Sequence, residues 1–301
     1  MNKISVVISA HNEEKNIEDC LKSAQELAYE IIVVDNSSTD KTGEIARKYT
    51  KKVFEQKNDP KNIDLQKNLG FSKATGDWIL SLDADERITP ELAAEIRSRI
   101  KDLRSKVQGF ELPRKNIIFG KWIEHTGWYP DYQLRLFRKG KGKYMSSKVH
   151  EQIIVDAETD RLSSPIHHEN YQSINQFLNR MIIYTDSEAN ALIKNGYEFN
   201  YLDSIRMPFQ EFLRRFFSEE GYKDGLHGLV LSLLMAFYHL IIFVKAWEKR
   251  KFIETEENIL EGFSPESKKI HEEFSHWISR AKEKETKNPI KKILLKATRR
   301  I

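Results

Sequence analysis

The chain has 301 residues, of which 31% are charged and 40% hydrophobic, so it is long enough to fold as one large domain or as one domain with an appendage. This composition excludes a mainly disordered chain, and the single cysteine, Cys20, excludes an intramolecular disulfide and indicates a reducing compartment. The net charge is +4, but residues 280–301 hold nine Lys and Arg against two Glu, so the basic character belongs to the C-terminal tail.

The first 85 residues alternate predicted strands and helices. Residues 4–9 form an uncharged, β-branched strand, and Asn12 is the expected N-cap of the helix that follows. A second strand at 31–34 ends at Asp35, the turn 36–40 caps a helix through about residue 49, and a short strand follows at 53–54. A helix around 64–74 leads into a strand that ends at Asp83, which predicts a parallel sheet with right-handed crossovers. The chain enters its first strand without the features of a secretory signal, so we expect a cytoplasmic protein.

Two carboxylates, Asp83 and Asp85, follow the last of these strands. Open α/β sheets bind ligands at the carboxyl ends of their strands, and Mg²⁺ or Mn²⁺ is commonly held there by one or two carboxylates together with substrate phosphates. The pattern therefore indicates a metal site for a phosphorylated donor. The alternative is that both residues only end a strand and cap the helix after Pro90. Neither a dinucleotide-binding glycine motif nor a P-loop is present.

Five motifs occur in order between residues 9 and 86. They are SAHNEE at 9–14, VVDNSSTD at 33–40, KNLG at 67–70, ATGDW at 74–78 and LDADE at 82–86. This series resembles family 2 glycosyltransferases with a GT-A fold. A looser match through 128–138 and 149–151 is similar to the branch that builds lipopolysaccharide core. The chain departs from the family at Ser-Ala-His, where many members have Pro-x-Tyr or Pro-x-Phe, and at Lys67, where the bidentate Arg is frequent.

The resemblance implies an α/β fold of GT-A type, with a Rossmann-like, mostly parallel sheet flanked by helices. It implies a nucleotide-sugar-binding and catalytic domain at 1–170 and a helical C-terminal extension at 171–301. The residues that it assigns to nucleotide binding are Ser9, Glu13, Asp35, Lys67 and Asp83. Asp85 would coordinate the divalent ion, with Asp83 contacting the ribose or the metal. Such an ion would neutralise the charge that grows on the leaving oxygen.

An inverting transfer also needs a base that removes the proton of the acceptor hydroxyl, and a carboxylate is the usual choice. Glu151, next to His150, matches the downstream acidic position of the family and is the first candidate. Asp131 is the second, and Asp156 and Glu124 follow. An exposed acid that pairs with a nearby Lys or Arg would explain either leading candidate without catalysis.

His167 and His168 are expected to be structural, because no Cys or third His lies at ligand spacing. Trp122, Trp128 and Tyr129 are candidates for an acceptor groove, although we expect at least one of them in the core.

From residue 171 the pattern becomes helical. An aromatic stripe at 209–217, flanked by arginines, describes either a helix at a membrane interface or ordinary core. Residues 229–244 are uncharged but shorter than the ~20 apolar residues of a spanning helix, which predicts a buried or interfacial helix. The basic tail alternates Lys with apolar residues and suits an anionic leaflet.

The leading hypothesis is an inverting, metal-dependent glycosyltransferase that moves a sugar from a nucleotide diphosphate donor, with a UDP-sugar favoured, to a glycan or lipid-linked acceptor. We expect it on the inner face of the plasma membrane, as a peripheral protein at an anionic surface, without a nucleic-acid partner and with a homo-oligomer left open. A nucleotidyltransferase is one alternative, although no glycine-rich phosphate loop follows the first strand. A non-catalytic, membrane-associated scaffold is another, although the acidic residues are retained.

Overall fold

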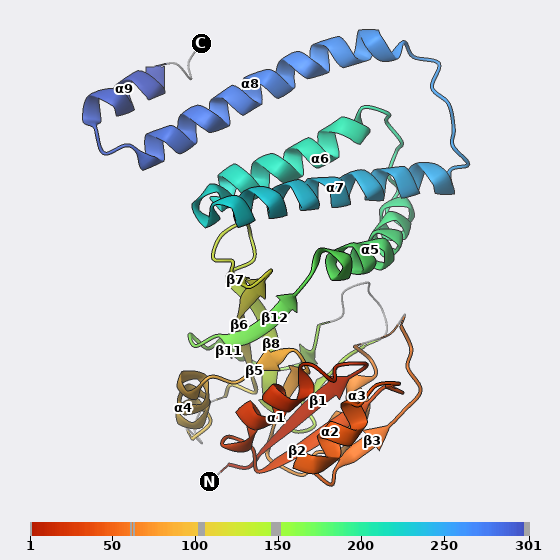
Figure 1. The fold of residues 1–301 in the computed structure, drawn as a ribbon, viewed down its shortest axis with the longest axis vertical. Coiled ribbons are helices and arrows are strands. Elements are labelled where there is room, and N and C mark those ends of the chain that lie inside the picture. The colour runs from red at the N-terminus through yellow and green to blue at the C-terminus, as the bar shows by residue number, and fades with distance from the viewer. Residues whose placement is uncertain (1, 61, 63, 102–105, 146–151, 298–301) are drawn as a thin grey trace. The chain divides into compact units, whose positions relative to one another are not determined.

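The computed structural model describes residues 2–60, 62, 64–101, 106–145 and 152–297. The chain forms two compact units. The first lies within residues 1–122 and 129–172, and the second within residues 123–128 and 173–301. The first unit is a β-sheet with helices, and the second is built of helices (Figure 1).

Four parallel strands form one half of the sheet, in the order β3-β2-β1-β4. They are β1 (Ile4–Ala10), β2 (Glu30–Asp35), β3 (Val53–Glu55) and β4 (Trp78–Asp83). The helices between them are α1 (Ile17–Gln25), α2 (Thr42–Tyr49) and α3 (Lys67–Lys73). This half of the sheet confirms the strands and helices predicted from the sequence, with small differences at the helix ends.

The other half of the sheet is mixed. Its strands continue from β4 in the order β8 (Asp131–Arg138), β6 (Gly109–Ile118), β12 (Ile166–Tyr171) and β5 (Glu86–Arg87). The short strands β7 (Lys121–Trp122) and β11 (Thr159–Arg161) also pair with β6, while β9 (Gly142–Lys143) and β10 (Ile154–Val155) form a separate pair. Helix α4 (Pro90–Arg99) has Thr89 as its N-cap. Together these elements confirm the α/β fold class.

Successive residues of β1 face opposite layers of the first unit. Val6 and Ile8 pack in the same apolar cluster as Leu21 of α1, whereas Val7 packs with Phe71 of α3 on the other face. Strand side chains alternate between the two faces, so a strand covered on both sides is apolar throughout. This explains the uninterrupted apolar run at the start of the chain.

The predicted N-cap at Asn12 is wrong. Helix α1 begins at Ile17, and Asn12 has a φ of 56°. Its side-chain oxygen accepts a hydrogen bond from the Thr39 backbone N–H at 2.8 Å, and its own N–H donates to Ser38 Oγ at 3.0 Å. Asn tolerates the left-handed region and bonds readily to nearby backbone. Asn12 therefore joins the loop after β1 to the loop after β2.

The second unit contains five α-helices and two shorter helical turns within its described residues. They are α5 (Ile174–Lys194), α6 (Asp203–Leu213), the π-helix η1 (Arg214–Ser218), the 3₁₀-helix η2 (Gly221–Asp224), α7 (Leu226–Lys249), α8 (Ile259–Glu285) and α9 (Pro289–Ala297). The segment 123–128 folds with them, because the buried carboxylate of Asp224 accepts hydrogen bonds from the His125 N–H at 2.9 Å and from Thr126 Oγ1 at 3.2 Å.

The aromatic stripe at 209–217 packs inside the second unit. Phe209 and Phe212 stack on Phe274 of α8, with ring centroids 5.8 and 6.0 Å apart, and Phe217 contacts Phe274 and Trp277. The flanking arginines form ion pairs, Arg206 with Glu266 and both Arg214 and Arg215 with Glu211. The core alternative therefore describes this stripe better than the membrane-interface alternative.

Helix α7 contains the uncharged segment 229–244 and extends it to 24 residues. By length and composition alone it could cross a membrane, although buried core helices pass the same test. It packs against α5 and α6 (Figure 1).

Gly70→Ala should destabilise the first unit by about 1–3 kcal/mol, because overpacking forces neighbouring groups apart. A Cβ at Gly70 would lie 2.4 Å from a methyl of Val7 and 2.9 Å from a methyl of Val34, so α3 would have to move off the sheet. Urea unfolding measures the effect. Ser72→Ala, at an exposed position of the same helix, is the control and should shift stability by less than about 0.5 kcal/mol. Equal stability of the two variants would contradict this close packing.

Candidate active site

Three parallel strands end at one edge of the sheet. In the strand register, Ser9 pairs with Asp83 of β4, and Ala10 pairs with Asp35 of β2. Asp35 and Asp83 therefore lie on either side of the carboxyl end of β1, where parallel sheets bind ligands. The sheet thus brings together Ser9, Asp35 and Asp83, as the sequence predicts.

The predicted nucleotide-binding residues at the ends of β1 and β2 make polar contacts with the neighbouring loops. Asn36 Nδ2 donates to Ser9 Oγ at 2.9 Å, and Gln56 Nε2 donates to Asn36 Oδ1 at 2.7 Å. One oxygen of Asp35 accepts a backbone N–H of the following turn at 3.0 Å. Ser9 and Asp35 are buried, and Glu13 is half-buried. Ser9 and Asp35 therefore hold the loops after β1 and β2 in place. The contact of these residues with a nucleotide stays a prediction.

Asp83 is held between two buried cations. Its Oδ1 lies 2.6 Å from Lys67 Nζ, and its Oδ2 lies 2.7 Å from Arg135 Nη2. Burial by itself raises the pKa of Asp83, but Arg135 and Lys67 outweigh it and hold that pKa well below its ordinary value. Burial alone would lower the pKa of Lys67 and of Arg135, yet the Asp83 carboxylate raises both. Asp83, Lys67 and Arg135 are therefore all ionised. Lys67 fixes the position of the Asp83 carboxylate, whether or not Asp83 also binds a ligand.

The ion pairs continue across the mixed half of the sheet. Arg135 Nη2 also lies 2.9 Å from an oxygen of the fully buried Glu86, and Arg114 Nη1 lies 3.9 Å from that same oxygen. Arg114 in turn makes two hydrogen bonds to Asp131, directly opposite it on β8. Carboxylates and cations thus alternate from α3 through β4, β8, β5 and β6.

Asp85 faces a histidine of β12. His168 Nε2 lies 3.5 Å from Asp85 Oδ2, and the other ring nitrogen lies 2.7 Å from Asn116 Oδ1. Asn170 donates to the same Asn116 oxygen at 3.1 Å. The pairing of β12 with β5 sets His168 opposite Glu86, the residue after Asp85. A carboxylate beside an imidazole whose second nitrogen is fixed by a hydrogen bond is an arrangement that divalent cations use. The contacts of the buried His168 agree with the structural role predicted for it, and a role as a metal ligand stays a proposal.

The charges of this region suit a divalent cation. The alternating cluster has four carboxylates (Asp64, Asp83, Glu86 and Asp131) and three cations (Lys67, Arg114 and Arg135), and Asp85 adds a fifth carboxylate, so the formal charge is −2. Among the described residues, no group of three or more His, Cys, Asp or Glu side chains could hold a metal by itself. Both oxygens of Asp83 contact cations, and the metal roles of Asp83 and Asp85 stay predictions.

Asp131, the second candidate base, is ion-paired with Arg114 and accepts a hydrogen bond from Gln133 at 2.8 Å. Burial raises the pKa of Asp131, but Arg114 and Gln133 outweigh it, so the pKa is lowered. A carboxylate with a lowered pKa is a weaker base. The geometry therefore favours an ion-pair role for Asp131 over a catalytic one.

The first candidate base, Glu151, and its neighbour His150 lie outside the described residues. Asp156 and Glu124 are both exposed. Glu151 therefore stays the leading prediction for the base.

The aromatic residues proposed for an acceptor groove separate into two groups. Trp122 packs against the edge of Tyr129, with ring centroids 5.5 Å apart, and Lys115 Nζ lies 4.5 Å from the centre of the Trp122 ring. Trp128 belongs to the second unit, where the guanidinium of Arg215 lies 5.5 Å from its ring. Only the first two rings lie together in the unit that contains the predicted site.

Sequence reasoning missed several members of this cluster: Glu86, Arg114, Asn116, Arg135 and Asn170. One signal was present, because Asp131, Gln133 and Arg135 are polar at alternate positions and so share one face of β8. The residues on β6 and β12 had no comparable local signal. They reach the site only through the strand pairing of the mixed half.

The fold is of the α/β class, and its candidate site is a sheet edge where paired cations and carboxylates lie next to an Asp–His contact. The model of the Glycosyl transferase family 2 matches residues 5–155, half of the chain, and the chain belongs to this family. It is therefore a glycosyltransferase, which confirms the enzyme class of the leading hypothesis over the nucleotidyltransferase and scaffold alternatives.

Two relatives illustrate the likeness. An uncharacterized glycosyltransferase of Rickettsia typhi is 28% identical over 82% of this chain and 88% of its own length. The lipopolysaccharide core biosynthesis glycosyltransferase LpsC of Rhizobium meliloti is 26% identical over 82% of this chain and 92% of its own. Among solved structures, residues 1–349 of S. aureus TarS align with a TM-score of 0.42 and 15% identity, over 85% of this chain and 94% of that one.

Arg135→Met should destabilise the protein by about 3–5 kcal/mol near neutral pH, because Asp83 and Glu86 lose the cation that they share. The pKa of Asp83 is depressed in the folded state, so the stability from its ionised form is present above its unfolded pKa of about 4 and is lost as the pH falls towards the folded pKa. The loss caused by Arg135→Met should therefore be largest above about pH 4 and shrink below it.

Guanidinium unfolding of both proteins across this pH range tests the prediction. Arg161→Met, which breaks an exposed pair with Glu111, is the control and should change stability little at any pH. A destabilisation by Arg135→Met that stays constant across the range would contradict the role of the Asp83 ion pair.

Proposed function

We propose that the protein is an inverting, metal-dependent glycosyltransferase that uses a nucleotide diphosphate sugar, with a UDP-sugar favoured. The acceptor is a glycan or lipid-linked glycan of cell-surface polysaccharide or lipopolysaccharide synthesis, at the cytoplasmic face of the membrane. The proposal rests above all on the contact between Asp85 and His168 at the carboxyl end of β4. Membership of family 2 supports the reaction class, and similarity to LpsC supports the acceptor class.

Asp85 and His168 fit a Mg²⁺ or Mn²⁺ ion. The carboxylate and the imidazole provide two ligand atoms, Asn116 fixes the ring, and the negative formal charge of the cluster favours a cation. Such an ion, when bound, would neutralise negative charge on the diphosphate as a Lewis acid. Two protein ligands suffice, because Mg²⁺ usually keeps waters and substrate phosphates as its other ligands.

Asp83 is suited to binding a sugar hydroxyl of the donor. Each oxygen of a carboxylate has two lone pairs, so contact with Lys67 or Arg135 leaves acceptor capacity on both oxygens. The two cations keep the carboxylate ionised and fix its orientation, which favours a ribose hydroxyl next to the end of β1. Lys67 therefore contributes to donor binding through Asp83.

Proton removal from the acceptor is the role that we propose for Glu151. A carboxylate accepts a proton less readily when a tight ion pair stabilises its charged form. Asp131 is held in this way by Arg114. Arg114, Gln133 and Asp131 instead offer an array of donors and acceptors on one face of the sheet, which suits the hydroxyl groups of a sugar acceptor.

Asp85→Asn should lower the rate of sugar transfer by about 10²-fold or more and leave the melting temperature nearly unchanged, because it removes a charge from the cation site. The measurement is UDP release from UDP-sugars with Mn²⁺, with and without a chelator. Asp19→Asn, at an exposed position of α1, is the control and should keep full activity. Activity that survives chelation would remove the metal from the proposal.

Glu151→Gln should lower kcat by about 10²-fold or more with little change in donor affinity, as expected for the loss of a general base. Asp131→Asn should instead raise the KM for the acceptor more than it lowers kcat. Steady-state kinetics with varied acceptor separates the two results. If Asp131→Asn causes the large loss of kcat and Glu151→Gln does not, the two roles must be exchanged.

A further inference from the structure

One face of α7 is apolar and exposed along almost the whole helix. Its exposed large hydrophobic residues are Leu226, Leu233, Phe237 and Val244, spaced seven, four and seven residues apart, so they share one side of a helix with 3.6 residues per turn. Leu233 is 52% exposed and Phe237 is 45% exposed. We call these four residues the α7 stripe. It is about 27 Å long, and no formally charged residue lies between Leu226 and Val244.

The opposite face of α7 contacts charged groups. His239 Nε2 lies 3.7 Å from Glu211, which is ion-paired with Arg214 and Arg215, and Tyr238 donates a hydrogen bond to Glu188 of α5. These charges belong to α5, α6 and η1, which all pack against α7. A helix that crossed a bilayer in this packing would take several charged side chains into hydrocarbon, which is costly. The structure therefore argues against α7 as a membrane-spanning helix.

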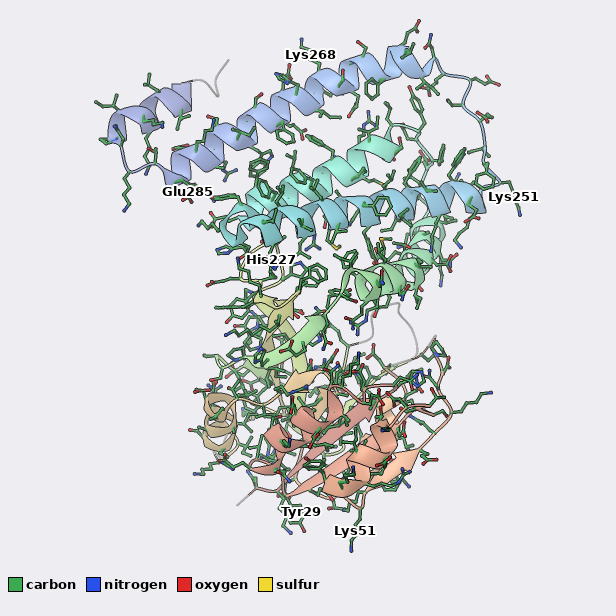
Figure 2. The ribbon with its side chains drawn as sticks, viewed as in Figure 1. Tyr29, Lys51, His227, Lys251, Lys268 and Glu285 are labelled. Carbon is green, nitrogen blue, oxygen red and sulfur yellow. The ribbon has the colours of Figure 1, made fainter. Side chains whose placement is uncertain are left out.

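We infer that α7 lies in the plane of a membrane surface, with the α7 stripe inserted among the lipid acyl chains and the face that contacts Glu188 and Glu211 kept on the protein side. This inference specifies the membrane part of the proposed function, but its test needs no catalysis. Failure here would leave the glycosyltransferase reaction untouched. Figure 2 labels His227, in the first turn of this helix, and Lys251, just beyond its last residue.

The charge of the same unit favours an anionic lipid surface as the occupant. Helix α9 has no acidic residue and is amphipathic, with Ile290 and Leu294 exposed one turn apart. Lys291 and Lys292 are exposed between them. Basic residues beside exposed apolar ones are the pattern of helices that lie on anionic bilayers. Apolar insertion of α7 and electrostatic attraction at α9 would then act together.

The test uses the full-length protein and a fluorescent reporter. Cys20 is fully buried, so Phe237→Cys can be labelled selectively with an environment-sensitive fluorophore at the centre of the α7 stripe. The control is Tyr29→Cys, at a residue that is 55% exposed in the first unit. Addition of vesicles of phosphatidylcholine with phosphatidylglycerol should shift the emission of the label at residue 237 to the blue, and the label at residue 29 should not respond.

Binding measurements complete the test. Leu233→Ser with Phe237→Ser should weaken co-sedimentation with these vesicles about tenfold or more, whereas Tyr29→Ser should not. Lys291→Gln with Lys292→Gln should weaken binding to the anionic vesicles about fivefold per charge, and leave binding to pure phosphatidylcholine unchanged. Bound wild-type protein should be released by an alkaline wash.

Three results would overturn the inference. An unchanged emission of the label at residue 237 would show that the stripe does not enter lipid. Resistance of the bound protein to the alkaline wash would point to a spanning helix. A wild-type oligomer that becomes monomeric in the Leu233→Ser, Phe237→Ser variant, with vesicle binding unchanged, would assign the stripe to contact with a second copy of the chain.

Discussion

The ion pairs of Asp83 are the interaction on which the site depends. A buried carboxylate costs several kcal/mol in lost hydration unless cations and hydrogen bonds replace the water. Here Lys67 comes from α3, which packs on the parallel strands β1 and β2, and Arg135 comes from β8 of the mixed half. The carboxylate is therefore satisfied only when the parallel and the mixed halves of the sheet have both formed. Assembly of the two halves of the sheet and formation of the Asp83 ion pairs therefore occur together.

The loops on the donor side are fixed by a different means, which is close approach of backbone and small side chains. At Gly43, a Cβ would lie 2.6 Å from an oxygen of Asp35, so a larger residue at the start of α2 would displace the carboxylate. Asn12 and Asn36 then tie the loops after β1 and β2 together through side-chain hydrogen bonds. A site that is rigid before its ligand arrives loses less conformational entropy on binding.

The sequence predicted the parallel half well because its information is local. Apolar strands that end at Asp35 and Asp83, and helices of ordinary length between them, can be recognised within windows of a few residues. Glu86, Arg114, Arg135 and His168 could not be assigned in this way, since their proximity depends on strand register between segments far apart in the chain. Asn12 failed for a related reason, because a contact with another loop overrode its preference for a helix cap. From sequence alone, the stripe at 209–217 fitted a membrane interface as well as a core. Its contact with Phe274 of α8, which is distant in the chain, decides for the core.

The small number of metal ligands has a thermodynamic consequence. The proposed site offers the cation two protein ligands, Asp85 and His168, so most of its coordination shell would come from water and the donor diphosphate. The cation and the donor would then each raise the affinity of the other by the same factor, as linkage requires. The protein without donor should bind Mn²⁺ weakly, and the donor without Mn²⁺ should bind weakly too. A site of this kind is complete for sugar transfer only when the cation and the donor are both bound, which limits the exposure of the metal to competing ligands.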